Sequence, residues 1–258
     1  MSNSADGRPT ALVTGAGYGI GRAIAVGLSR NGYDLILTGR SSDLLKKVSD
    51  EVARGGGRAD DMPLDLTVPA DRENLVDRAR SLKGGLSLFV HCAATTTDPD
   101  IESELGQTPH DRITEVMETT ATAGMHILKG LKSPLAQAAP SHAIFLASDW
   151  AFRGSHGPPI FSAAKAALVQ FARTSRREFQ GAGIALSVIV PGDVASYDAD
   201  WAEPTWSIDD PVQQVRASLG EQRIPLIDIV ESVLFIINRH MSRIEELHIA
   251  PSDPAYDY

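Results

Sequence analysis

Short apolar runs alternate with longer amphipathic stretches along the whole chain. The runs ALVTG, DLILTG and LSLFVHCA have the length and composition of buried strands. The amphipathic stretches at 19–31 and 41–54, which follow the first two runs, space their apolar residues as helices do. Strands that alternate with helices pair in parallel through right-handed crossovers. The pattern therefore predicts an α/β fold with a doubly wound parallel sheet, the Rossmann fold.

The same alternation continues through the second half of the chain. No change in composition marks a linker, so we expect a single domain over residues 1–258. The segment at about 193–223 is rich in Asp, Trp and Pro and has no clear period, so we expect a flap on the substrate side. The further predicted strands are ADDMPLDL, HAIFLAS, IALSVIVPG and IEELHI, and the further predicted helices span 69–82, about 109–135, about 160–180 and about 227–239.

Composition and charge narrow the possible classes of function. The chain has 258 residues and a formal net charge of −9, which argues against broad binding to nucleic acid or to an anionic membrane surface. No apolar run approaches the roughly 20 residues that cross a bilayer, and the N-terminal MSNSADGRP has no apolar signal core. The single cysteine, Cys92, allows no intrachain disulfide. We expect a cytoplasmic protein that binds a small-molecule substrate and no metal.

The stretch TGAGYGIG, residues 14–21, lies directly between the first predicted strand and the first predicted helix. Gly15 allows a tight turn, Gly19 lets a pyrophosphate approach the backbone, and Gly21 lets the helix pack closely on the sheet. The free N–H groups and the dipole at the start of that helix favour a phosphate. The stretch therefore predicts a dinucleotide-binding loop.

The end of the second predicted strand indicates which dinucleotide is bound. A site that prefers NAD places an acidic residue there to hold the ribose 2′-hydroxyl, whereas this chain has Gly39 and Arg40. A guanidinium suits a 2′-phosphate better than a hydroxyl. Arg40 therefore favours NADP, with NAD as the alternative. Asp65, after the third predicted strand, is a candidate acceptor for the adenine amino group.

These motifs together resemble the short-chain dehydrogenase/reductase family, from Thr10 to about Ile249. In that family the loop reads Thr-Gly-x-x-x-Gly-x-Gly, as residues 14–21 do, and an Asp follows the third strand, as Asp65 does. The stretch PGDVAS, 191–196, matches the family's Pro-Gly turn after the sixth strand. The cofactor contacts that the resemblance implies are made by Gly15, Tyr18, Gly19, Ile20, Gly21, Arg40, Asp65, Leu66, Ala93, Lys165, Pro191, Gly192 and Val194.

The resemblance is uneven at the catalytic residues of the family, which are Ser, Tyr, Lys and Asn. The matching positions are Ser148, Phe161 and Lys165, with Thr120 as the best match to the Asn. The family's fourth strand usually ends in Asn-Asn-Ala-Gly, where residues 91–94 read HCAA. In the family's mechanism the Tyr donates a proton while hydride leaves the nicotinamide, and the Lys lowers the Tyr pKa and binds the ribose. Phe161 has no such proton, and the loss of a general acid costs about 10²- to 10⁴-fold in rate.

Two routes would keep such a chain active as an oxidoreductase. Another group supplies the proton, for which Asp149 and His156 are candidates, or the substrate is an imine or enone that accepts hydride without that acid. Three alternatives remain open: a non-redox cyclase, lyase or isomerase, a cofactor-binding protein without turnover, and a Phe introduced on purpose. Thr120 and the HCAA stretch argue against the last alternative, because a single designed change would leave the remaining site intact. His91 is expected to be structural.

Members of the family usually pair through the long central helix and the helix that carries the catalytic Lys. The resemblance therefore implies a homodimer or homotetramer, and the Ala-rich face SAAKAAL would allow close packing of two helices. Trp150 lies near the predicted site, and Trp201 and Trp206 lie in the predicted flap, where they are candidates to cover a substrate.

Overall fold

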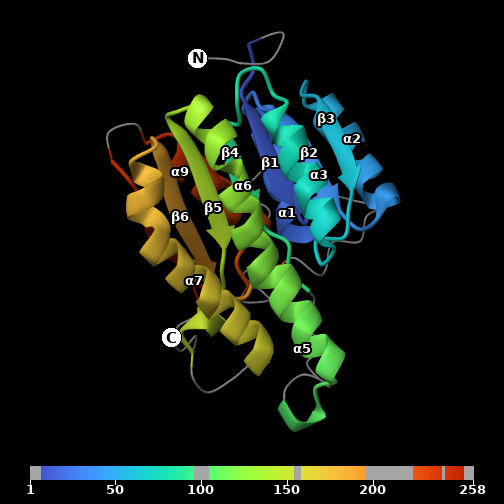
Figure 1. Ribbon diagram of the computed structural model, residues 1–258, viewed down its shortest axis with the longest axis vertical. Coiled ribbons are helices and arrows are strands. Elements are labelled where there is room, and N and C mark those ends of the chain that lie inside the picture. Colours follow the sequence, from blue (N-terminus) through green and yellow to red (C-terminus); the bar gives the residue numbers. More distant parts are fainter. Residues whose placement is uncertain (1–6, 96–104, 154–157, 196–222, 240–241, 253–258) are drawn as a thin grey trace.

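The structure is a computed structural model that describes residues 7–95, 105–153, 158–195, 223–239 and 242–252. Its described strands form one parallel sheet in the order β3-β2-β1-β4-β5-β6-β7 (Figure 1). This is the doubly wound Rossmann arrangement that the alternation of elements predicted. The strands are β1 Thr10–Thr14, β2 Asp34–Gly39, β3 Ala59–Pro63, β4 Leu88–His91, β5 Ser141–Leu146, β6 Ile184–Pro191 and β7 Glu246–Ile249.

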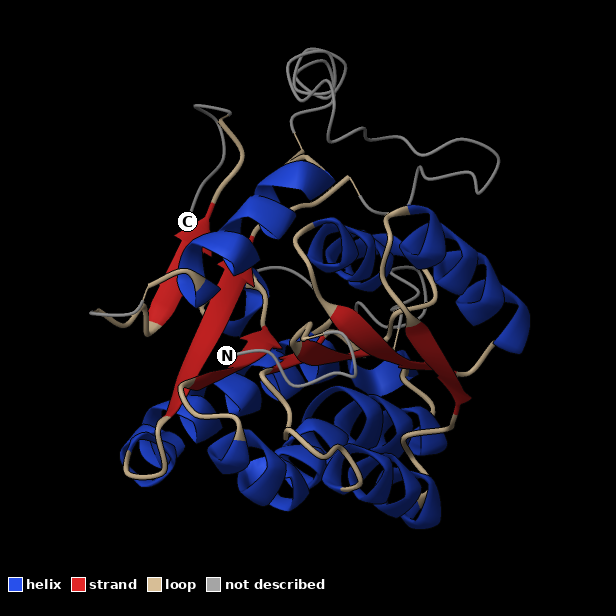
Figure 2. Cartoon of the chain, turned by 90° about the horizontal axis from the view of Figure 1, so that it is seen from above, coloured by secondary structure: helices blue, strands red, loops and turns tan. Residues whose placement is uncertain are grey.

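Helices cover both faces of the sheet (Figure 2). One core cluster joins the sheet to α1, α2 and α9, and a second joins its other face to α3, α6 and α7. The bounds are α1 Gly19–Arg30, α2 Ser42–Arg54, α3 Pro69–Arg80, α5 His110–Met117, η2 Glu118–Thr122, α6 Ala123–Gln137, α7 Pro159–Gln180 and α9 Leu226–Ile237, with short 3-10 turns η1 Leu105–Gln107 and η3 Asp149–Ala151.

The side chains of β1 alternate between the two core clusters. Ala11 and Val13 belong to the cluster with α1, whereas Leu12 belongs to the cluster on the opposite face. Successive side chains of a strand point to opposite faces, so a strand covered on both sides is apolar at every position. This explains why the runs that predicted strands are continuously apolar.

Local capping sets several of the helix boundaries. The Ser41 hydroxyl accepts a hydrogen bond from the Leu44 amide at 3.3 Å, so α2 begins at Ser42 rather than at Ser41 itself. Pro69 begins α3, where its missing N–H costs no hydrogen bond and its fixed φ suits the first turn. These signals are local in sequence, which is why the predicted boundaries lie within a few residues of the observed ones.

The prediction of one continuous helix over about 109–135 is wrong in one respect. The tract is divided into α5 and α6 by the π-helical turn η2. At this turn the backbone carbonyl of Thr120 is bonded by the buried side chain of His91 from β4. A helix that is approached by a side chain in this way departs from the regular α-helical hydrogen-bond ladder.

The predicted flap at about 193–223 lies mostly outside the described residues, as do His156, Ser196, Trp201 and Trp206. Its two described ends lie side by side, because Val194 and Ile224 form a parallel bridge. Among the helices that the structure describes, none has the length and hydropathy needed to cross a membrane.

Candidate active site

The glycine-rich loop follows β1 and has no room for side chains at two positions. Gly15 has a φ of 67°, and a Cβ there would lie 2.8 Å from the Ala93 backbone. A Cβ on Gly21 would lie 2.1 Å from the carbonyl oxygen of Gly15. Gly19, the first residue of α1, has a φ of 55°. Close approach of backbone segments therefore requires glycine at positions 15 and 21.

The start of α1 carries no acidic group. Tyr18 is its N-cap residue, with an extended backbone and a side chain that makes no capping hydrogen bond. The first turn contains neither Asp nor Glu, and Ile20 in that turn packs against the core. Amides at a helix start without a side-chain acceptor are suited to a phosphate. The geometry of this loop therefore fits a dinucleotide.

The polar residues at the ends of β2 and β3 lie close together. Arg40, directly after β2, is exposed and its guanidinium lies 3.6 Å from the Glu115 carboxylate of α5. Asp65 accepts hydrogen bonds at Oδ1 from the Thr67 amide at 2.9 Å and from the Thr67 hydroxyl at 2.8 Å. These bonds, and the nearby Arg40, hold the pKa of Asp65 below its ordinary value.

Four of the remaining predicted cofactor residues are mainly packed in the protein interior. Leu66 is buried in the second core cluster and its carbonyl accepts a hydrogen bond from Arg72 at 2.6 Å. Pro191 ends β6, and Val194 is buried beside Ile224. The Ala93 amide donates to the Thr14 hydroxyl at 3.2 Å. Gly192 follows β6 directly, and its amide donates to the Ile249 carbonyl at 2.8 Å.

Lys165 is buried on α7 at the carboxyl edge of the sheet. Its ammonium donates to the carbonyl of Leu146, the last residue of β5, at 2.6 Å. No carboxylate among the described residues pairs with it. Burial lowers the pKa of Lys165 to about 8, and the nearby Cys92 thiol acts in the opposite direction. A buried, unpaired and readily deprotonated amine is uncommon in a protein and is typical of functional sites.

The ring of Phe161 lies between Lys165 and Trp150. The Lys165 ammonium is 5.3 Å from the centre of the Phe161 ring, and Trp150 meets the same ring edge to face at 5.8 Å. Phe161 and Lys165 are four residues apart on α7, so both project from one face of the helix. Phe161 and Trp150 are each partly exposed. The amine therefore faces an aromatic surface that is open to solvent on one side.

Ser148 and Asp149 follow β5 beside these residues. The Ser148 hydroxyl accepts from the Trp150 amide at 3.3 Å and donates to the Asp149 carboxylate at 3.1 Å. Asp149 is buried, and its other oxygen lies 3.0 Å from the Arg153 guanidinium. Both oxygens of the Asp149 carboxylate thus have partners within the protein. The structure thus brings Ser148, Asp149, Phe161 and Lys165 to one edge of the sheet.

His91 and Thr120 form a second cluster of buried polar residues near Lys165. The Nδ1 atom of His91 lies 2.9 Å from the Thr14 hydroxyl, and its Nε2 atom lies 3.2 Å from the Thr120 carbonyl. Burial, together with the charge of Lys165, lowers the pKa of His91 to about 3, and the bond to Thr120 acts in the opposite direction. The imidazole is therefore neutral, and with Nε2 protonated it donates to Thr120 and accepts from Thr14. His91 thus joins the ends of β1 and β4 to η2.

Comparison with known proteins identifies the family. Residues 9–204 match the short chain dehydrogenase family. The chain belongs to that family. It is 30% identical to the 3-oxoacyl-(acyl-carrier-protein) reductase FabG of Salmonella typhimurium over 182 residues, which cover 70% of this chain and 72% of that protein. It is also 30% identical to an uncharacterized oxidoreductase of Myxococcus xanthus over 190 residues, 72% of each chain.

Solved structures with the same fold extend over almost all of this short-chain dehydrogenase. The L-sorbose reductase from Gluconobacter frateurii, complexed with NADPH and L-sorbose, is similar at a TM-score of 0.80 and 20% identity, over 97% of both chains. An alcohol dehydrogenase from Thermococcus sibiricus, complexed with 5-hydroxy-NADP, is similar at 0.79 and 22% identity, over 97% of this chain and 99% of that one. These similarities establish the fold.

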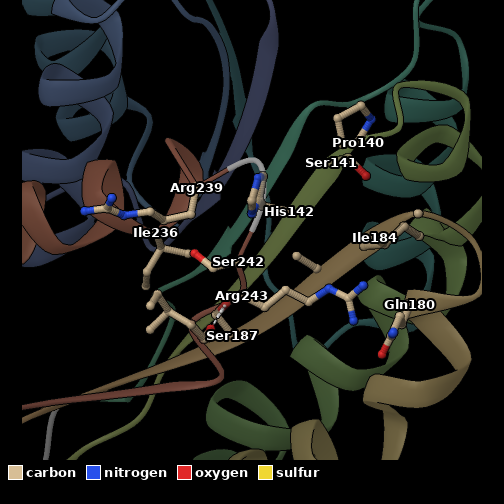
Figure 3. Close-up of a pocket in the computed structure, with 13 residues that line it drawn as sticks. Pro140, Ser141, His142, Gln180, Ile184, Ser187, Ile236, Arg239, Ser242 and Arg243 are labelled. Atoms are coloured by element: carbon tan, nitrogen blue, oxygen red, sulfur yellow. Dashed lines mark hydrogen bonds between the residues drawn. The ribbon is translucent and has the colours of Figure 1, made fainter.

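A separate cavity of this short-chain dehydrogenase lies at the opposite edge of the sheet. It has a volume of about 250 Å³ and is bordered by the first residues of β5 and β6, among them Ser141, His142 and Ile184 (Figure 3). Arg243 extends along it towards Gln180. None of the predicted site residues lines this cavity. Because ligands of doubly wound sheets bind at the carboxyl ends of the strands, we do not assign the active site to it.

The motifs did not single out Gly124 or Glu115, and they gave Thr14 only as the first residue of the glycine-rich loop. A Cβ on Gly124 would lie 2.6 Å from the His91 ring, so the glycine makes room for the imidazole. A glycine within a predicted helix was the available signal for this contact. Nothing in the sequence paired Glu115 with Arg40, because they lie in separate elements far apart along the chain.

We predict that Gly124→Ala destabilises this short-chain dehydrogenase by about 1–3 kcal/mol, because the added methyl group overpacks against His91. The same substitution in a His91→Ala background should cost much less, which urea unfolding of the four proteins would measure as a coupling energy. Gly130→Ala, which meets Val76 instead of His91, is the matched control and should show no such coupling. Additive effects of the Gly124 and His91 substitutions would contradict the prediction.

Proposed function

We propose that the chain is an NADP(H)-dependent oxidoreductase with an altered proton donor, which reduces an imine, an enone or an unusual carbonyl compound. One observation gives this proposal its strongest support. The buried amine of Lys165, which no described carboxylate neutralises, faces the hydroxyl-free ring of Phe161 at the carboxyl edge of the sheet. The arrangement keeps the amine of the family's catalytic pair and omits the acid.

Three features support NADP as the cofactor. The amides at the start of α1, which no capping side chain and no acidic residue of the first turn engages, suit a pyrophosphate. Arg40 supplies a cation at the end of β2, where an NAD-specific site has a carboxylate. Several structures with the same fold are complexes with NADP or NADPH, among them the L-sorbose reductase and a metagenomic short-chain oxidoreductase. When bound, the cofactor supplies the hydride.

The side chains around Lys165 have distinct roles in this proposal. The Lys165 ammonium gives one hydrogen bond to Leu146 and has two more N–H groups for ribose hydroxyls. Its positive charge also stabilises negative charge that develops on a substrate oxygen. Ser148 orients the substrate through its hydroxyl. His91 stays neutral and holds the surrounding backbone, so it is a positioning residue and supplies no proton.

Of the two routes around the missing acid, the contacts favour a substrate that does not need one. Asp149 was the first candidate for a replacement donor, but its carboxylate is shared between Ser148 and the Arg153 guanidinium. Because both of its oxygens already have partners within the protein, neither is free to approach a substrate. Hydride addition to the β-carbon of an enone would produce an enolate, whose charge the Lys165 ammonium can stabilise and whose α-carbon would then take a proton from water. A protonated imine would bring a second cation to a ring that Lys165 already faces, so among the proposed substrate classes we expect enones to be reduced faster than imines.

The first experiment is calorimetric titration of the chain with NADPH and NADH, followed by NADPH oxidation with panels of enones, imines and ketones. We expect NADPH to bind more tightly than NADH and enones to be reduced faster than ketones of similar size. Failure to bind either nucleotide would contradict the proposal as a whole. Binding without turnover on any panel would instead favour a non-redox enzyme or a cofactor-binding protein.

A further inference from the structure

Helix α5 brings a carboxylate to the residue that follows β2. The Oε1 atom of Glu115 lies 3.6 Å from Nη1 of Arg40, and its Oε2 atom lies 2.7 Å from Nη1 of Arg112. Glu115 belongs to the helical tract that extends beyond the carboxyl edge of the sheet (Figure 1). The arginine that is expected to meet a 2′-phosphate thus already has an anionic neighbour from a distant part of the chain.

The position of Glu115 is set by its second oxygen. Arg112 is one helical turn earlier on α5, so the pair forms within the helix and directs the other oxygen towards Arg40. Among the residues that the structure describes, Asp65 is a second carboxylate near Arg40, but the bonds from Thr67 fix it in its own turn. Glu115 is therefore the carboxylate that directly competes for the exposed guanidinium.

The Glu115 carboxylate should affect the binding of a 2′-phosphate and of a free 2′-hydroxyl in opposite directions. A 2′-phosphate that binds Arg40 must displace Glu115 or accept a like charge beside it, and both reduce its affinity. A ribose with a free 2′-hydroxyl meets no such repulsion and can donate a hydrogen bond to the carboxylate. That is the contact which NAD-preferring sites obtain from an acidic residue at the end of the second strand, where this chain has none.

We propose that Glu115 is a specificity-determining residue, which lowers the affinity for NADP(H) by competing for Arg40 and supports NAD(H) through its carboxylate. The inference rests on the proposed function, in which Arg40 receives the 2′-phosphate. Under this arrangement the chain binds both nucleotides, with a preference for NADP(H) that is smaller than Arg40 alone would give.

The experiment compares Glu115→Gln with the wild-type chain by calorimetric titration with NADPH and NADH. The substitution keeps the size of the side chain and removes its charge. We expect the Kd for NADPH to fall by about 2- to 5-fold, because exposed charge pairs are worth little more than that. The Kd for NADH should stay the same or rise by about 2- to 5-fold. The change for NADPH should shrink at high salt, because both charges are accessible to solvent.

Two further variants make the comparison decisive. Asp111→Asn removes an equal charge from the same helix, where Asp111 bonds the Arg112 amide and is not paired with Arg40, so it should leave both Kd values within about twofold. In an Arg40→Gln background, Glu115→Gln should improve NADPH binding less than in the wild-type chain, because the competition is gone and only the repulsion between the two anions remains.

The possible outcomes distinguish failure of the proposed function from failure of the role proposed for Glu115. If the wild-type chain binds neither nucleotide, the proposed function fails and this inference fails with it. If the wild-type chain binds NADPH but Glu115→Gln leaves the ratio of the two Kd values unchanged, or shifts both equally, the proposed function stands and the role of Glu115 is overturned.

Discussion

Phe161→Tyr is expected to raise the reduction of simple ketones by about 10²- to 10⁴-fold, the range that a positioned general acid contributes. The substitution adds one hydroxyl to a ring that already lies 5.3 Å from the Lys165 ammonium. That charge would lower the pKa of the new phenol and make it a better acid near neutral pH. Because Phe161 is only partly buried, the hydroxyl can be accommodated without repacking the core.

NADPH oxidation with a panel of ketones measures this gain, with NADPH affinity determined in parallel. Phe152→Tyr is the matched control, since Phe152 is exposed beside His248 and Arg173 and has no contact with Lys165. A Phe161→Tyr variant that binds NADPH normally but gains no ketone reduction would show that more than one missing hydroxyl separates this site from a ketone reductase.

Lys165→Met is expected to raise the free energy of unfolding and to weaken the binding of NADPH. The buried ammonium has a pKa of about 8 instead of the ordinary 10.5, which corresponds to about 3 kcal/mol of folding free energy lost to keeping it charged. Methionine has a similar length and no charge, so the free energy of unfolding should rise by about 1–3 kcal/mol at pH 7. Affinity for NADPH should fall, because the donors to the ribose are lost.

The pH dependence of this difference has a definite sign. Below pH 8 the folded chain holds Lys165 charged and the full cost is present. Between about 8 and 10.5 the folded state releases the proton while the unfolded state keeps it, so the wild-type chain gains stability as the pH rises. The advantage of Lys165→Met in urea unfolding should therefore shrink from pH 7 to pH 10.

Lys132→Met is the control for this series. Lys132 also lies near an aromatic ring, that of Phe179 at 5.7 Å, but its side chain is accessible and pairs with Glu178. Its removal should leave NADPH binding unchanged and should not reproduce the pH-dependent gain in stability. A Lys165→Met variant that is less stable than the wild-type chain at pH 7 would contradict the expected cost of the buried charge.

The fold and the phosphate loop were predictable because their signals are local. Continuous apolar runs mark strands that are buried on both faces, and the glycines at 15, 19 and 21 belong to one short stretch between a strand and a helix. The grouping of Ser148 with Lys165 was also predictable, since consecutive parallel strands place their ends at a common edge.

The remaining features depend on contacts between distant parts of the chain. The π-helical turn η2 coincides with a bond from His91 on β4, and no periodicity within the helix signals it. The strand LSLFVHCA is shorter than predicted, because the Ala93 amide bonds the Thr14 side chain instead of continuing the ladder beyond His91. The pairing of Glu115 with Arg40 likewise arises only when α5 folds against the end of β2.

The contact between His91 and Gly124 also links two positions in any redesign of this site. An imidazole at position 91 has no space unless position 124 lacks a side chain, whereas a glycine at 124 is tolerable beside a smaller residue. A mutagenesis library that varies position 124 alone is therefore expected to yield few folded chains. A library that varies both positions together can recover pairs in which a smaller residue at 91 accommodates a side chain at 124.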